Sequence, residues 1–149
     1  MLTYKVFIFI AMILFHILED FHLQGILASM KQKSWWQFEC NKLGIEYKSS
    51  KYKYDHVIGL YIHALENSIF ITLPLIIDGL ITTFTTNPNN YLFIGWAFII
   101  FANTVVHAII DDFKCNSKGI NLIVDQILHF IFIILFFSLY EKYLGLWIR

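Results

Sequence analysis

The sequence predicts an all-α, integral-membrane four-helix bundle with an interfacial cytoplasmic loop. Hydrophobic residues make up 58% of the 149 residues and charged residues only 15%, against roughly 25% charged residues in an average soluble domain. Four apolar segments meet or approach the about 20 residues that a membrane-crossing helix needs. The 11 Lys and Arg balance 11 Asp and Glu, so no basic surface is expected and nucleic acid is excluded as a partner.

The expected helices span 3–28, 57–80, 91–110 and 120–143, and we expect them to form a single transmembrane domain over 1–149. A cleaved signal peptide is the alternative for the first segment, but Glu19 and Asp20 stand where a small-residue cleavage motif should begin. A Thr/Asn/Pro turn precedes the third helix, and a short charged connection precedes the fourth. These short connections make the last three helices antiparallel neighbours.

The lysines predict the orientation, because cytoplasmic loops are enriched in Lys and Arg. Loop 30–56 contains six lysines and the connection before the fourth helix contains Lys114 and Lys118, which makes eight, against Lys5, Lys142 and Arg149 on the opposite side. We therefore expect both termini outside the cytoplasm, in an inner (cell) membrane protein. Trp96 is expected in an aromatic belt, and His56, in the loop beside Asp55, is expected to be solvated.

Polar residues inside the spans recur at a spacing of four, which places the members of each set on one helical face. Such residues are costly in a bilayer and are functional candidates. With the loops placed as above, each helix brings His or Asp to the same depth, near the cytoplasmic boundary. Imidazole and carboxylate groups projecting into a bundle are typical metal ligands. The candidate ligands are His16, Asp20, His63, His107, Asp111, Asp125 and His129.

These seven side chains exceed the four ligands of one tetrahedral zinc ion, so either more than one ion is bound or some members orient the ligands. The donor set favours zinc, with manganese or iron as alternatives. The alternative without a metal is a set of His/Asp hydrogen bonds that clasp neighbouring helices. That alternative explains three carboxylates at one depth poorly, because like charges repel in a low dielectric unless a cation compensates them.

Four elements resemble a prokaryotic membrane-protein family, domain of unknown function 3307 (DUF3307). They are HILEDFHLQGILASMKQK from His16, LYIHAL around His63, HAIIDDFK from His107 and DQILH from Asp125. This resemblance covers nearly the whole chain except 35–56, and it implies the architecture but no reaction. The H-x3-D pairs His16/Asp20 and His107/Asp111 are also similar to those of zinc-dependent phospholipase C, P1-type nucleases and inner-membrane metal-dependent hydrolases; Asp125 and His129 run in the reverse order.

The leading functional hypothesis is a metal-dependent hydrolase that acts on a phosphoester of a membrane lipid or lipid-linked substrate at the cytoplasmic leaflet. Asp112 or Glu66 would be the general base, and Lys114 would contact a phosphate. The alternatives are a small metal-ion or proton transport module that uses the same cluster, and a non-catalytic interaction subunit with a structural metal. The apolar outer halves of most helices favour the enzyme. Oligomerisation is left open.

Overall fold

The computed structural model describes residues 2–85 and 91–144, and all of its regular structure is helical. The long helices are α1 (Leu2–Leu18), α4 (Asp55–Thr85), α5 (Tyr91–Cys115) and α6 (Leu122–Leu139). Within these described residues, four segments are long and apolar enough to cross a membrane, Thr3–Leu23, Asp55–Thr83, Phe93–Cys115 and Leu122–Lys142. The predicted all-α four-helix bundle is therefore confirmed.

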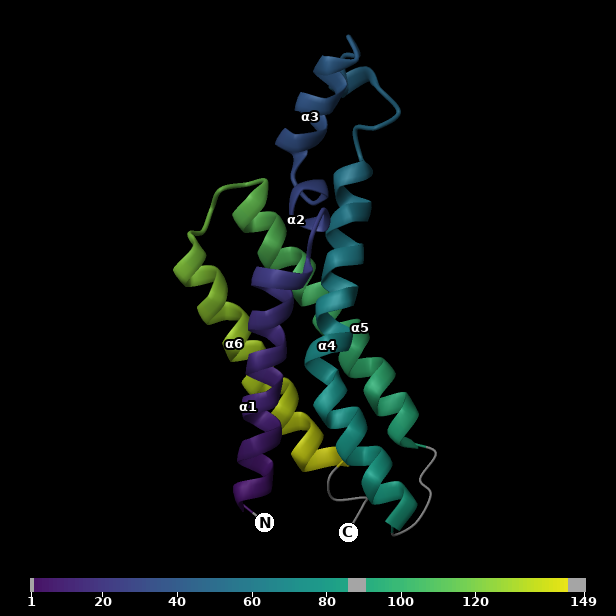
Figure 1. Cartoon of the computed structure of the whole chain (residues 1–149), viewed down its shortest axis with the longest axis vertical. Coiled ribbons are helices and arrows are strands. Elements are labelled where there is room, and N and C mark those ends of the chain that lie inside the picture. The colour runs from purple at the N-terminus through teal and green to yellow at the C-terminus, as the bar shows by residue number, and fades with distance from the viewer. Residues whose placement is uncertain (1, 86–90, 145–149) are drawn as a thin grey trace.

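The four long helices form a closed arrangement in which α1 packs against α4 and α6, and α5 packs against the same two helices. The start of α1 and the end of α4 lie at one end of the bundle (Figure 1). At the other end lie residues 24–54 and the connection 116–121, which together carry most of the lysines. We call this the basic end.

The observed ends of the first and third long helices differ from the expected ends, and both differences lie at charged residues. The first helix ends at Leu23 instead of residue 28, and α5 continues to Cys115 instead of ending at 110. The charged residues after Ile110 were expected to start a loop. Asp111 is instead fully buried with ion-pair partners, so the helix can continue through it.

The first helix ends in a π-helical turn, η1 (Glu19–Leu23), in which the Gln24 N–H donates to the Glu19 carbonyl at 3.1 Å. A π-turn closes over five residues, where an α-turn closes over four. The wider turn accommodates the neighbours Glu19 and Asp20 side by side in the interior, at 0% and 3% exposure. The backbone thus brings two consecutive carboxylates into the bundle.

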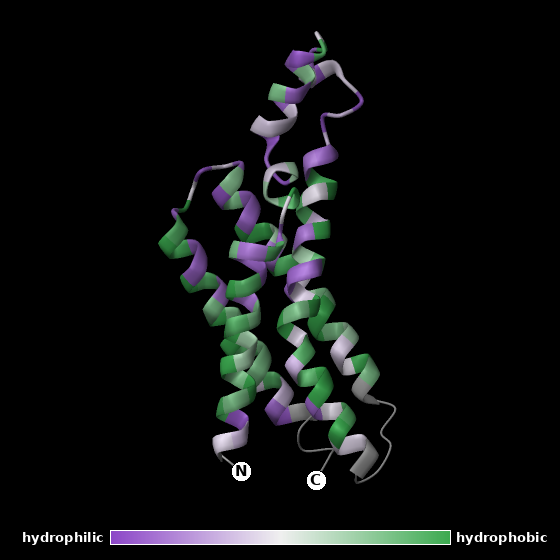
Figure 2. Cartoon of the chain, viewed as in Figure 1, coloured by the Kyte–Doolittle hydropathy of each residue, from purple (hydrophilic) through white to green (hydrophobic). Residues whose placement is uncertain are grey.

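Polar and apolar packing are separated along the bundle axis (Figure 2). The half away from the basic end holds an apolar core that includes Met12, Leu75, Ile133 and Phe136. Trp96 belongs to this core at 5% exposure, where it lies against Gly79. The expected belt position of Trp96 is therefore wrong, because the missing side chain at Gly79 lets the indole pack between helices.

Residues 24–54 form a short helical segment that returns to the bundle. Helix α2 (Leu27–Met30) packs against α4, and α3 (Lys33–Lys42) and a 3-10 turn (Tyr47–Ser49) follow it beyond the bundle end (Figure 1). Contact between α2 and α4 depends on Gly59. A Cβ atom at that position would lie 2.7 Å from the Met30 carbonyl oxygen.

We expect Gly59→Ala to push α2 away from α4, because the obstructing atoms are backbone and cannot rotate aside. The overpacking should lower the free energy of unfolding by about 1–3 kcal/mol, measurable by thermal unfolding in detergent. Ile58→Ala is the matched control, since Ile58 is 60% exposed and the change should stay within about 0.5 kcal/mol. Equal stability of the two variants would contradict the close approach.

Candidate metal centre

A cluster of buried polar side chains fills the bundle on the side of the basic end. Every long helix contributes to it, and each contributed side chain is at most 4% exposed. The members are His16, Glu19, Asp20, His63, Asn67, His107, Asp111, Asp125 and His129. All seven predicted metal ligands lie in this cluster.

Asp20, His63, His107 and Asp111 form the first donor group, with one ligand atom from each within 4.8 Å of the others. His63 is at its centre. The His63 Nε2 atom lies 3.2 Å from Asp111 Oδ2, 3.2 Å from His107 Nε2 and 3.5 Å from Asp20 Oδ1. Two imidazoles and two carboxylates converging from three segments can hold a metal ion.

Asp111, Asp125 and His129 form a second donor group. His129 Nε2 lies 3.7 Å from Asp111 Oδ1 and 3.5 Å from Asp125 Oδ1. Asp111 therefore belongs to both groups. Its Oδ2 atom faces His63 and its Oδ1 atom faces His129, which is the arrangement of a carboxylate that bridges two cations.

Charged side chains of both signs meet in the cluster. Two ammonium groups enter it: Lys31 Nζ lies 2.6 Å from Asp111 Oδ2, and Lys114 Nζ lies 2.6 Å from Asp125 Oδ2. They face the four buried carboxylates of Glu19, Asp20, Asp111 and Asp125. Buried charges need compensation, so the two carboxylates in excess require positive charge from protonated imidazoles of the cluster or from a metal ion.

Several potential ligand atoms are buried and form no hydrogen bond with the described residues. They include Asp20 Oδ1, Asp111 Oδ1, Asp125 Oδ1 and His129 Nε2. Most buried polar atoms in proteins are satisfied, and each exception is costly. Because these atoms belong to the two donor groups, the donor set fits a metal ion, and the buried His/Asp groups could hold one.

His16 lies in the cluster but in neither donor group. Its ring contacts the side-chain amide of Asn67 and lies 3.3 Å, at Nε2, from Gln126 Oε1. Gln126 in turn donates through Nε2 to Asp20 Oδ2 at 2.8 Å and to Asp125 Oδ2 at 3.1 Å. In this arrangement His16 and Gln126 connect the two donor groups and orient their carboxylates.

Sequence reasoning did not identify Glu19, Lys31 and Gln126 as members of the site. Glu19 Oε1 lies 3.3 Å from His63 Nδ1, and its other oxygen accepts a hydrogen bond from Asn67. A spacing of four marks Asp20 but not Glu19, which stands three residues after His16, a spacing that also lies on one helical face. Lys31 was counted only as a lysine of the cytoplasmic loop, although it is 4% exposed.

The three predicted catalytic residues lie outside the two donor groups. Lys114 binds Asp125 and is 24% exposed at its side chain. Asp112 is half-buried and its Oδ1 accepts a hydrogen bond from Asn116 Nδ2 at 2.8 Å. Glu66 is half-buried on α4, one turn after His63.

Comparison with known proteins assigns no function to these residues. No family model, no curated protein and no solved structure matches the chain.

Proposed function

We propose that the chain is an inner-membrane, metal-dependent hydrolase that acts on a phosphoester of a lipid or lipid-linked substrate. The observation that carries the proposal is the sharing of Asp111 between two buried donor groups. Paired metal sites are common in enzymes that cleave phosphoesters.

The donor set favours zinc, with manganese or iron as alternatives, because it combines imidazole with carboxylate and contains no thiolate. A divalent metal held here would lower the pKa of a bound water molecule toward 7 and offset negative charge on a phosphoryl group. Asp20, His63, His107 and Asp111 would hold one ion. Asp111, Asp125 and His129 would hold the second.

The surrounding residues have roles that follow from their contacts. Glu19 Oε1 lies 3.3 Å from His63 Nδ1 and would orient the ring so that Nε2 is directed at Asp111. Lys114 stands at the more open edge of the cluster and can exchange Asp125 for a substrate phosphate. Asp112 and Glu66 stay candidates for the general base. With the lysine-rich end in the cytoplasm, the site would open toward the inner leaflet, and both termini would lie outside.

The test is metal content and phosphoesterase activity of the protein purified in detergent. We expect bound divalent metal and hydrolysis of a phosphomonoester or phosphodiester reporter, with both lost in His107→Ala. His22→Ala is the matched control, because His22 is exposed outside the cluster, and it should retain both. A metal-free wild type, or a His107→Ala variant with unchanged metal and activity, would refute the proposal.

Transport of a metal ion or proton is the second candidate, and buried polar residues on α4 favour it. Asn67, Ser68 and Thr72 are each 0% exposed and continue from His63 toward the opposite end. Asn103 Nδ2 donates to Ser68 Oγ at 3.0 Å, and the Tyr140 hydroxyl donates to Asp78 Oδ2 at 2.8 Å further along. Fully buried Leu75 interrupts this path, so we rank transport second. Ion flux into proteoliposomes that Thr72→Val abolishes would reverse the ranking.

A further inference from the structure

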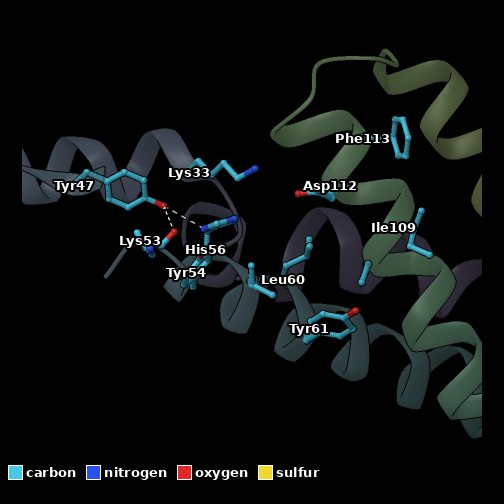
Figure 3. Close-up of a pocket in the computed structure, with 12 residues that line it drawn as sticks. Lys33, Tyr47, Lys53, Tyr54, His56, Leu60, Tyr61, Ile109, Asp112 and Phe113 are labelled. Carbon is cyan, nitrogen blue, oxygen red and sulfur yellow. Dashed lines mark hydrogen bonds between the residues drawn. The ribbon is translucent and has the colours of Figure 1, made fainter. Parts of the chain in front are cut away.

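A pocket of about 530 Å³ lies outside the metal cluster, between residues 33–54 and the ends of α4 and α5 at the basic end (Figure 3). Leu60, Ala64 and Ala108 are buried together between α4 and α5, and two of them, Leu60 and Ala108, also line the pocket. None of the side chains of the metal cluster lines the pocket. The pocket is therefore a separate site.

One part of the pocket wall is polar and cationic. Lys33 and Lys53 line it, and the Lys53 ammonium lies 4.7 Å from the centre of the Tyr54 ring, which also lines the pocket. The single carboxylate in the lining is that of Asp112. Lys33 and Asp112 face each other across the opening (Figure 3). Asp112 already accepts a hydrogen bond from Asn116. The excess positive charge matches an anion that bears one negative charge.

Tyr47 and His56 complete the polar wall. The Tyr47 hydroxyl donates to the Lys53 carbonyl at 2.7 Å and lies 3.2 Å from His56 Nδ1 (Figure 3). His56 is 4% exposed, so the expectation of a solvated histidine is wrong. Burial raises the pKa of Tyr47, with smaller contributions from Cys40 and Asp55, and the hydroxyl therefore stays neutral and does not repel an anion.

The remaining wall is apolar and open to the side of the bundle. Tyr61, Ile109 and Phe113 line it, and they are 46%, 51% and 52% exposed. These residues belong to the first turns of one apolar span and the last turns of another. In a bilayer this wall would face acyl chains, while the lysines would stand at the depth of the phosphate groups.

We propose that this pocket binds one anionic phospholipid, with its phosphate between Lys33 and Lys53 and the start of an acyl chain along Ile109 and Phe113. The volume is within the range of small-molecule pockets, and it suits a head group with the adjoining part of the chains. The proposed role of this pocket is to hold a lipid molecule. That role requires neither the metal centre nor catalysis.

Native mass spectrometry of the delipidated, detergent-purified protein tests the proposal. Dioleoyl phosphatidylglycerol should bind as one molecule per chain, and dioleoyl phosphatidylcholine, with the same chains and no net charge, should bind much more weakly. The Lys33→Ala/Lys53→Ala variant should bind the anionic lipid about 25-fold more weakly, because each lysine near an anionic head group contributes about a factor of five.

The matched control is Lys42→Ala/Lys48→Ala, which removes two lysines of the same segment that do not line the pocket. It should bind like the wild type, whereas Ile109→Trp, at an exposed position, should fill the apolar part and reduce binding. Equal binding of the two lipids would overturn the proposal, as would equal binding of water-soluble glycerophosphoglycerol. His107→Ala separates this proposal from the enzymatic one: retained lipid supports the pocket, and lost lipid places the lipid in the metal cluster instead.

Discussion

Asp111→Asn is expected to empty both halves of the proposed metal centre. Asp111 is the only residue common to the two donor groups found among the described residues, and it offers a different oxygen to each. An amide keeps the size of the side chain but removes the charge and one acceptor. We expect elemental analysis to show a fall from about two metal equivalents to none, with phosphoesterase activity at background.

Two variants make this expectation specific. Asp125→Asn changes only the second group, so about one equivalent should remain. Asp112→Asn removes the carboxylate next along α5, which lies outside both groups, and should leave metal content unchanged. If Asp111→Asn and Asp125→Asn lose the same amount of metal, Asp111 does not bridge two ions.

Lys31→Met is expected to destabilise the metal-free protein strongly. The Lys31 and Asp111 side chains are 5% and 0% exposed and their charged atoms are 2.6 Å apart. Removing one partner of such a buried pair costs about 3–5 kcal/mol, because the other charge stays buried without compensation. We expect a lower midpoint of thermal unfolding in EDTA.

Divalent metal should restore much of the stability of Lys31→Met, because a cation that binds only the folded state stabilises it by mass action. The apparent metal affinity should also rise, since the ammonium group no longer competes for Asp111 Oδ2. Lys42→Met is the control: Lys42 pairs with Glu39 but its side chain is 53% exposed, so its contribution should be at most about 1 kcal/mol. A wild-type midpoint for Lys31→Met in EDTA would contradict the buried pair.

The number and type of the long helices follow from the sequence alone, because each apolar run is long enough to cross a bilayer and is bounded by polar residues. The ends of the helices do not. The end of α5 depends on whether Asp111 finds a partner inside the bundle, and that partner, Lys31, comes from a segment 80 residues earlier. The sequence around Asp111 therefore does not predict this long-range ion pair.

The members of the site could be predicted only where α-helical spacing holds. His107 with Asp111 and Asp125 with His129 stand four residues apart on regular helices, and in each pair the ion-pair distance is below 4 Å. Glu19 falls outside such a pattern because it precedes Asp20 directly. An additional carboxylate beside a predicted ligand, within an apolar span, is the signal that could have identified it.

The π-turn after α1 determines how the fold responds to a change in chain length. One codon separates a five-residue turn from a four-residue turn, so deleting a single residue within Glu19–Leu23 would let the helix continue as an α-helix. A π-turn takes up one extra residue, so the residues on either side of it would keep their present orientation. The same deletion within the α-helical part of α1 would rotate everything that follows by about 100° around the helix axis. The segment that contains Lys31, the ion-pair partner of Asp111, begins directly after this turn. A one-residue deletion before the turn would therefore move Lys31 away from Asp111, whereas one within the turn would leave the rest of the chain in register.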